Sequence, residues 1–241
     1  MESFIQKKSK LLQAIFISYI VMIIIIILIY AAAMLFYPGG NFVNDNDDVW
    51  GYNLIYNGMC DMRELTSVNG QPNVISSTLL KIGTIGICVA MFFFFGTLWI
   101  FFQDKLSTKI MSWIASILGT AFGPLNVAII FEHSTYQVHM LFNIFAPLSL
   151  NIAIIMYTIV YFLYRRLPKA NQYSFLILSI FSVSYSVIVG VSSSVGGLFE
   201  KIVHRLGANI LYIVTMAVFL IQAFSIYFHL KKGELRESVL S

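Results

Sequence analysis

The chain has 241 residues, of which 59% are hydrophobic and 11% are charged, and its formal net charge is +4 at neutral pH. A soluble domain carries about 25% charged residues, so this composition excludes a soluble domain with one attached anchor and indicates an integral membrane protein. The cations are dispersed in short segments and are not interleaved with stacking aromatic residues on one basic face, so we expect no nucleic-acid partner.

Long apolar stretches dominate the chain, and each is long enough for a helix that crosses the bilayer core, which takes about 20 residues. They run approximately over residues 14–36, 79–102, 110–131, 138–164, 173–198 and 207–230. The sequence therefore predicts an all-α fold in which residues 1–241 form a single domain of six transmembrane helices. The first stretch exceeds the roughly 7–15 apolar residues of a cleaved signal peptide, so we expect a retained signal-anchor helix.

The lysines and arginines are distributed unevenly between the predicted spans. Eleven of the 15 lie on the side of the two terminal tails, namely Lys7, Lys8, Lys10, Lys105, Lys109, Arg165, Arg166, Lys169, Lys231, Lys232 and Arg236. Cytoplasmic loops carry such an excess, so we predict that both termini are cytoplasmic and that residues 37–78 form a long first outer loop. The sequence holds no Asn-x-Ser/Thr acceptor for glycosylation, which suits the cytoplasmic membrane of a prokaryote.

The long outer loop is expected to cap the helices. It begins with Tyr37, Pro38, Gly39 and Gly40, a run that stops a helix. A loop of this length in a compact protein is uncommon and often functional. Apolar residues between Trp50 and Leu65 recur near helical spacing, which predicts a short amphipathic helix on the outer surface.

Three patterns concern the packing of the predicted helices. The run Phe92–Phe95 indicates contact with lipid. Asn143, Pro147 and Asn151 are four residues apart, so they share one helix face, which we expect to look into the bundle. The many serines of the fifth span favour helix packing over a nucleophile, because small side chains allow helices to approach closely.

Most of the unusual polar residues fall in or near the predicted outer half. The candidate ligand-binding residues are Asn57, Asn69, Asn73, Glu132, His133, Asn143 and His204. Asp61 of the outer loop and His139, which lies near the outer start of the fourth span, form a candidate catalytic pair. Ionisable groups at the membrane edge are costly and usually have a partner. We therefore expect these residues to converge on a polar pocket that opens outward.

Several interpretations of this polar cluster remain open. Asp61 and His139 would make an acid/base couple, since imidazole titrates near neutral pH. With Glu132, His133 and His204 they would instead bind a divalent metal such as zinc, although His133 and His139 would not share a helix face. A lipid-headgroup site is a third interpretation. In a fourth, the polar groups only tie the outer loop to the helices, and the sequence does not decide whether the protein is an enzyme.

Four short motifs carry a resemblance to a known group of proteins. They are Tyr37-Pro38-Gly39-Gly40, Cys60-Asp61-Met62, Asn69-Gly70-Gln71-Pro72-Asn73, and Phe131-Glu132-His133 followed by His139-Met140-Leu141-Phe142. Together they resemble the uncharacterised six-span prokaryotic membrane proteins related to the DRAM/Frag/Sfk-like superfamily. Asp61 matches the Asp of an outer Ser-Asp-Leu-Gly-like motif there, and His139 matches a His that opens span four. Cys60 stands where Ser is usual, and the proline of a Phe-Pro-Glu-like turn is absent.

The resemblance implies an association with membrane lipids, which are the partners that we expect. Eukaryotic relatives in the superfamily act in membrane-lipid and glycolipid-anchor remodelling, or in lysosomal and autophagy roles. The leading hypothesis is a protein that binds or modifies lipid headgroups from the outer leaflet. The alternatives are a small-solute or ion transporter, with Asn126, Asn143 and Asn151 near mid-depth, and a non-catalytic membrane scaffold. The oligomeric state does not follow from the sequence.

Overall fold

The computed structural model describes residues 2–43, 50–131, 136–164 and 167–232, without the side chains of residues 2–7, 136–140 and 143. The long helices are α1 (Glu2–Leu35), α2 (Val74–Leu98), α3 (Leu106–Phe131), α4 (Tyr136–Tyr164), α5 (Lys169–Val195) and α6 (Gly197–Lys232). Two short 3-10 helices are η1 (Met59–Met62) and η2 (Trp99–Phe102). Among the described residues the extended pairing is limited to isolated bridges, from Gly39 to Trp50 and from Thr66 to Pro72. The all-α prediction is confirmed for this part of the chain.

Within the described ranges, six helices are long and apolar enough to cross a membrane. The helices extend beyond the predicted spans, most clearly at the start of α1 and α6. Hydropathy identifies the residues that suit hydrocarbon, whereas backbone hydrogen bonds carry a helix on into its polar flanks. Because α1 ends at Leu35 and α2 begins at Val74, the long loop between them is residues 36–73, and we call this segment the cap.

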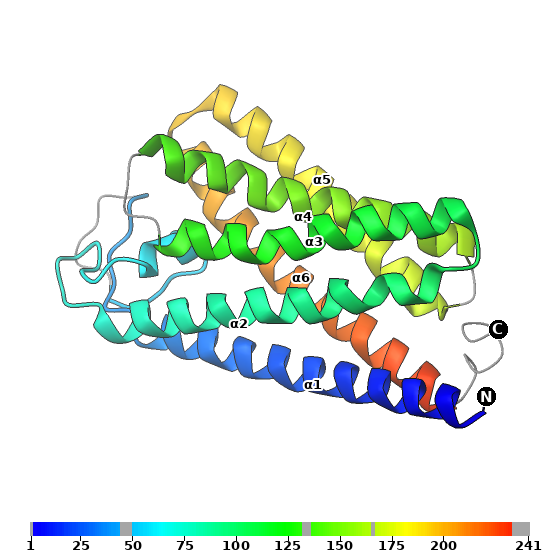
Figure 1. Cartoon of the computed structure of the whole chain (residues 1–241). Coiled ribbons are helices and arrows are strands. Elements are labelled where there is room, and N and C mark those ends of the chain that lie inside the picture. The colour runs from blue at the N-terminus through cyan, green and yellow to red at the C-terminus, as the bar shows by residue number, and fades with distance from the viewer. Residues whose placement is uncertain (1, 44–49, 132–135, 165–166, 233–241) are drawn as a thin grey trace.

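The helices form one elongated bundle with the cap at one end (Figure 1). The start of α1 and the end of α6 lie at the opposite end, which we call the terminal end. Helix α1 packs along α2, α3 packs against α2 and α4, and α6 packs against α1 and α5. The cap is thus placed over the ends of α1, α2 and α6.

The turn between α5 and α6 decides what the end of α6 near the cap can reach. Gly196 has φ of 71° and Gly197 has φ of 67°, a left-handed conformation that glycine adopts without a steric penalty. The chain therefore reverses at once, and α6 begins at Gly197. The expected gap between the fifth and sixth spans, residues 199–206, is helical instead. Lys201 and Arg205 consequently project from a rigid helix toward the cap.

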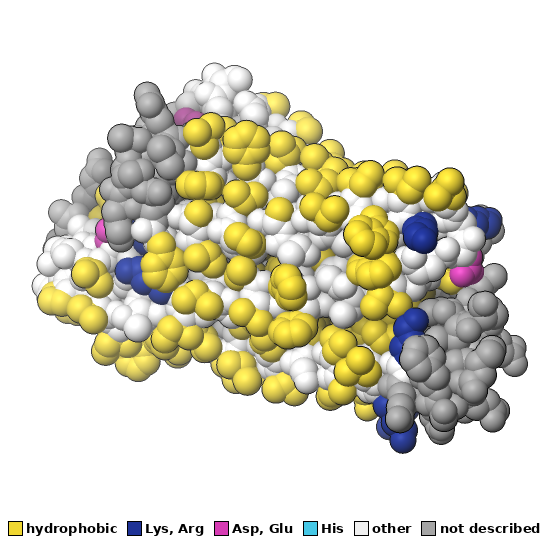
Figure 2. Space-filling model, viewed as in Figure 1, with side chains coloured by type: hydrophobic (Ala, Val, Ile, Leu, Met, Phe, Trp, Pro, Cys, Tyr) yellow, Lys and Arg dark blue, Asp and Glu magenta, His cyan; other side chains and the backbone are white. Residues whose placement is uncertain are grey.

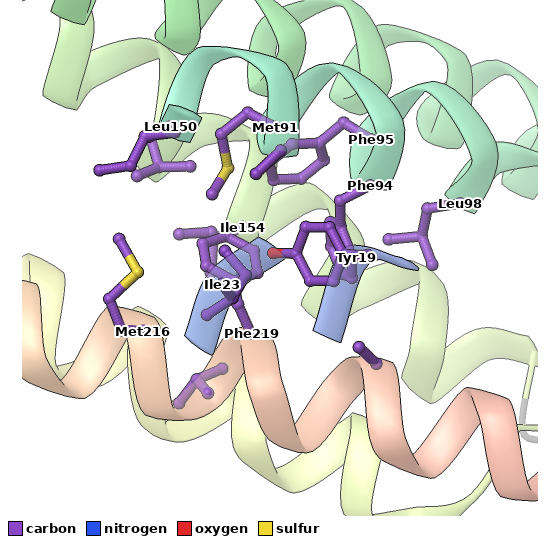
Figure 3. Close-up of a cluster of buried hydrophobic side chains, with 14 of the residues drawn as sticks. Tyr19, Ile23, Met91, Phe94, Phe95, Leu98, Leu150, Ile154, Met216 and Phe219 are labelled. Atoms are coloured by element: carbon purple, nitrogen blue, oxygen red, sulfur yellow. The ribbon is translucent and has the colours of Figure 1, made fainter. Parts of the chain in front are cut away.

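Aromatic side chains fill the middle of the bundle (Figure 3). The Phe94 ring centroid lies 5.1 Å from that of Tyr19 and 5.0 Å from that of Phe219. In the run Phe92–Phe95 the first two members are exposed, as contact with lipid would require, whereas the last two are buried, so the expected lipid contact is wrong for those two. Successive helix residues point about 100° apart, so four in a row cannot all face lipid.

Glycines of α3 allow α2 to approach closely. A Cβ on Gly119 would lie 2.4 Å from the Phe95 ring, and one on Gly123 would lie 2.8 Å from the Cα of Cys88. Contacts this short do not occur between real atoms, so both positions need glycine at the present helix separation. This is the small-residue packing that membrane helices use.

The polar face predicted for α4 is only partly directed inward. The Ser182 hydroxyl of α5 donates to the Asn151 side chain, whereas Pro147 is exposed, so the prediction of a shared inward face is wrong for Pro147. The side chain of Asn143 lies outside the described residues. Ser174, Ser182 and Ser192 of α5 are buried, which agrees with the helix-packing interpretation of the serines. That interpretation is wrong for the serines of α5 that are exposed, namely Ser184, Ser186, Ser193 and Ser194.

Candidate functional site

The cap replaces the expected amphipathic helix with turns that asparagine side chains hold. Asn53 Oδ1 accepts a hydrogen bond from the backbone N–H of Ile55 at 2.9 Å, and Asn57 Oδ1 accepts one from the N–H of Asn53 at 2.9 Å. Such local bonds compete with helical ones for the same backbone groups. Between Trp50 and Leu65 only the short helix η1 forms. The apolar spacing therefore predicted the wrong structure here.

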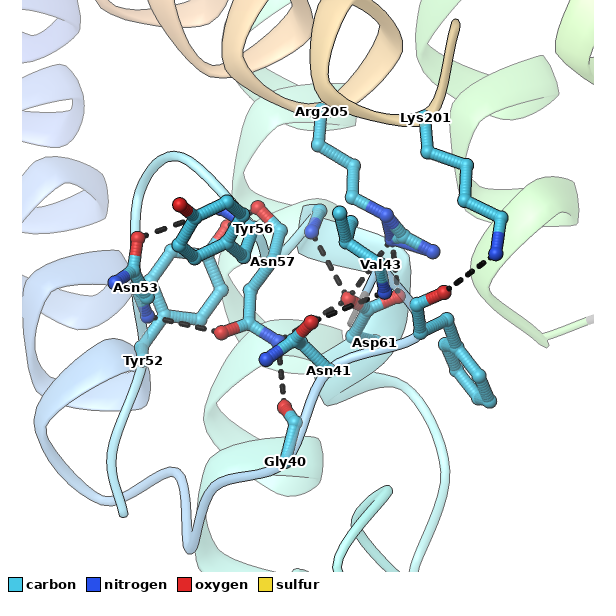
Figure 4. A network of polar contacts seen from close by, with 12 residues as sticks. Gly40, Asn41, Val43, Tyr52, Asn53, Tyr56, Asn57, Asp61, Lys201 and Arg205 are labelled. Carbon is cyan, nitrogen blue, oxygen red and sulfur yellow. Dashed lines mark hydrogen bonds and ion pairs between the residues drawn. The ribbon is translucent and has the colours of Figure 1, made fainter. Parts of the chain in front are cut away.

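Asp61 on η1 is the buried carboxylate of the site (Figure 4). Arg205 on α6 places its Nη1 3.2 Å from Oδ1 and 3.1 Å from Oδ2 of Asp61. The N–H of Gly58 donates to Oδ2 at 3.0 Å, and Asn57 Nδ2 donates to the same oxygen at 3.3 Å. Burial raises the pKa of Asp61, while Arg205, Gly58 and Asn57 oppose that rise. Among the described residues, the hydrogen bonds and the ion pair of this carboxylate come from the cap and from α6.

A second set of bonds joins the cap to α6. Asn209 Nδ2 donates to the carbonyls of Leu54 and Asn57, each at 2.8 Å. The hydroxyl of Tyr52 donates to Asn209 Oδ1 or to the Asn57 carbonyl, each at 3.1 Å. Asn57 Nδ2 also donates to the Gly40 carbonyl at 2.8 Å, which fixes the first part of the cap. We call Tyr52, Asn57, Asp61, Arg205 and Asn209 the cap network.

The first turns of α6 add two contacts to Phe42. Lys201 Nζ donates to the Phe42 carbonyl at 3.1 Å, and the Arg205 guanidinium carbon lies 5.7 Å from the Phe42 ring centroid. Lys201, Arg205 and Asn209 are spaced four residues apart and so share one face of α6. This face is the docking surface of the cap.

Sequence reasoning did not single out Arg205, Asn209 or Tyr52 as site residues. A sequence signal for Arg205 existed, because Lys201 and Arg205 are cations on the side of the membrane where the predicted topology has few. A cation in such a place, at helical spacing from Asn209, indicates a polar partner. Hydropathy did not reveal this signal, since it assigned residues 199–206 to a loop.

The other described candidates serve different segments. Asn73 Nδ2 donates to the carbonyls of Met62 and Glu64, at 3.1 and 2.8 Å. Asn69 Nδ2 donates to the Pro38 carbonyl at 3.2 Å. Both residues thus hold the cap together, apart from the cap network.

The described histidine of the set, His204, faces away from Asp61. Its Nε2 lies 4.0 Å from a carboxylate oxygen of Glu200 and 3.5 Å from the hydroxyl of Ser193, and its side chain is 43% exposed. The expected single pocket therefore separates, in the described part of the chain, into the cap network, the bonds within the cap and this group beside α5.

The catalytic pair and the metal site depend on residues that lie wholly or partly outside the described part. Glu132 and His133 fall outside it, and so do the side chains of His139 and Asn143. The Asp61–His139 pair therefore stays a prediction. Within the described ranges no three His, Cys, Asp or Glu side chains gather to hold a metal. Arg205 directly against Asp61 would repel a cation there.

Neither family models, curated proteins nor solved structures match this chain. The relation to the DRAM/Frag/Sfk-like superfamily accordingly stays a prediction from the four motifs. Any functional conclusion must come from the geometry of the cap and from its surface.

Proposed function

We propose that this chain is a lipid-associated, multi-pass membrane protein whose cap contacts the headgroups of the outer leaflet. In this proposal Asp61 fixes the cap on α6 and does not act as a catalyst. The observation that carries the proposal is the set of large apolar side chains that the cap exposes while several of its polar side chains are buried.

Among the described cap residues, a set of polar side chains is buried and a set of large apolar side chains is exposed, while Glu64, Thr66 and Gln71 are also exposed. Asn41, Asn57, Asp61, Ser67 and Asn73 are all buried. By contrast Trp50 is 79% exposed and Leu65 is 58% exposed, and Phe42, Leu54 and Ile55 are exposed as well. Large exposed apolar patches mark contacts with membranes or other proteins, and Trp and Tyr favour the headgroup level. A cap immersed among headgroups satisfies both sets of residues.

The distribution of lysine and arginine supports the outer leaflet as the side of contact. The cytoplasmic excess of these residues belongs to the terminal end of the bundle, which holds the start of α1 and the end of α6. The cap then lies on the opposite face of the membrane. An apolar groove between α1 and α2, bounded by Val21, Ile25, Ile29 and Ile82 among others, offers a further surface for lipid chains.

Two alternatives receive less support from the described residues. Transport needs polar groups that can be reached from both sides near mid-depth, whereas rings such as Phe94, Phe95 and Phe219 fill the middle of the bundle. A catalytic Asp61 needs a free oxygen for substrate, whereas both of its oxygens accept hydrogen bonds within the cap network.

Trp50 is the probe that tests the proposal. Replacing Trp99 and Trp113, which pack together with ring centroids 4.8 Å apart, by Phe leaves Trp50 as the single tryptophan. In vesicles we expect lipids brominated near the headgroup to quench Trp50 fluorescence more than lipids brominated at the chain ends. If iodide in the aqueous phase quenches Trp50 and neither bromolipid does, the cap stands in water and the proposal is wrong.

A further inference from the structure

A pocket of about 240 Å³ lies where the rim of the cap meets α2. Its lining consists of Arg63, Glu64, Leu65, Thr66 and Lys81. Lys81 is seven residues into α2, or roughly 10 Å along its axis at about 1.5 Å per residue, which places it at the edge of the predicted hydrocarbon span. Figure 2 shows basic side chains near the cap end, with hydrophobic side chains beside them.

The two cations of the pocket differ in how firmly they are held. Arg63 donates from Nε and Nη2 to Glu64 Oε1 at 2.8 and 2.6 Å, and from Nη1 to the Ile129 carbonyl at 3.4 Å. These bonds hold the Arg63 side chain in place at the side of the pocket, and the bond to Ile129 also joins the cap to the last turn of α3. Lys81, in contrast, forms no hydrogen bond or ion pair with any described residue.

A half-buried ammonium at this depth calls for an anion. Ionisable side chains at the membrane edge are costly without a partner, and an ammonium binds phosphate as a point charge through charge-assisted hydrogen bonds. The neighbouring side chains suit such an anion, since Thr66 offers a hydroxyl and Arg63 adds positive potential. Arg63 is paired with Glu64, so Lys81 is the residue that supplies the attraction for an anion.

We infer that this pocket binds a phosphate group, with Lys81 as the residue that supplies the attraction. The place of the pocket at the bilayer edge favours the phosphate of an anionic phospholipid, and free phosphate is the other source with the same chemistry. The inference rests on the proposed immersion of the cap in the outer leaflet. It goes further by naming a site, a ligand class and a residue outside the cap network.

The experiment measures lipid retention by native mass spectrometry on the full-length protein. Detergent-solubilised protein is incubated with equal amounts of phosphatidylglycerol and phosphatidylcholine, and the retained lipid is identified. We expect phosphatidylglycerol to be retained in preference, Lys81→Gln to reduce its retention about tenfold, and Lys81→Arg to restore it. Lys109→Gln is the matched control, because Lys109 is an exposed lysine near the start of α3, at the terminal end of the bundle. We expect no change in lipid retention.

A second arm separates the two sources of phosphate. Inorganic phosphate is added to the lipid-free protein and followed by the broadening of its phosphorus NMR signal. Broadening that disappears in Lys81→Gln, without preferential retention of phosphatidylglycerol, assigns the site to soluble phosphate. Lysine-dependent retention of phosphatidylglycerol assigns it to lipid. If Lys81→Gln binds both probes as well as the original protein does, the inference is overturned.

Failure of this inference is distinguishable from failure of the proposed function. Quenching of Trp50 by bromolipids does not involve Lys81. If bromolipids quench Trp50, the two phospholipids are retained equally and the phosphate signal shows no broadening that depends on Lys81, the cap is immersed and the pocket is not a phosphate site. If Trp50 lies in water and the retention of phosphatidylglycerol depends on Lys81, the phosphate site stands and the proposed immersion of the cap is wrong.

Discussion

Removing one partner of the Asp61–Arg205 ion pair should release the cap. In Arg205→Gln the carboxylate of Asp61, whose side chain is 6% exposed, loses its charged partner while it stays buried. Breaking a buried pair in this way typically destabilises a protein by about 3–5 kcal/mol. The Arg205 side chain is itself 20% exposed, so water screens part of the interaction. We therefore expect about 3 kcal/mol, at the low end of that range.

The loss should appear in the cap before it appears in the bundle. Amide hydrogen exchange of residues 50–65, followed by mass spectrometry, should accelerate in both Arg205→Gln and Asp61→Asn, whereas exchange in the middle of α2 stays slow. In the double variant the two changes should couple by about 0.5–3 kcal/mol, because the residues are in contact.

The matched control for this prediction is Lys201→Gln, one turn earlier on α6. Lys201 is exposed and makes a single hydrogen bond to the Phe42 carbonyl, so its loss should cost under about 1.5 kcal/mol. Wild-type exchange rates in both single variants, or strictly additive effects in the double variant, would refute the assignment of this pair as the anchor of the cap.

Two further predictions concern protonation and helix packing. Burial raises the pKa of Asp61 above 3.8, so its contribution to the free energy of unfolding is fully present below about pH 4 and declines as pH rises through the folded-state pKa. An infrared titration of its carboxyl stretch should show the raised midpoint, and Arg205→Gln should move it higher; an unshifted midpoint would contradict this. Gly119→Ala should destabilise the bundle by about 1–3 kcal/mol through the Phe95 ring, whereas Gly96→Ala, with open space around its Cβ, should be neutral or stabilising in the same detergent unfolding assay.

The apolar stretches predicted the six helices because burial in hydrocarbon demands long runs of apolar residues, and such runs are visible in one dimension. The cap could be located in the same way, as the long segment between the first two runs. The partner of Asp61 could not be predicted in this way, since residues at the same depth can lie on helices that do not face each other. His139 and Arg205 both suit the carboxylate by depth, and the reversal at Gly196 brings Arg205 to it.

Local chemistry explains the other differences between sequence and structure. Trp50 to Leu65 has helical spacing, but the side chains of Asn53 and Asn57 bind the backbone N–H groups that a helix would use. The four residues of the phenylalanine run are identical, but helix geometry directs two of them outward and two into the core. A hydropathy average over a window of residues predicts neither this division nor the turns of the cap.

The separation of Asp61 and Arg205 along the chain has a consequence for biosynthesis. The two residues are 144 positions apart, and at about 5–20 residues per second the ribosome needs roughly 7–30 s to bridge them. During that interval the cap has already been made, while its docking helix has not. The closing of the cap therefore waits for α6 and reports the insertion of that helix. A protease that recognises an undocked cap would in effect monitor whether α6 has been inserted.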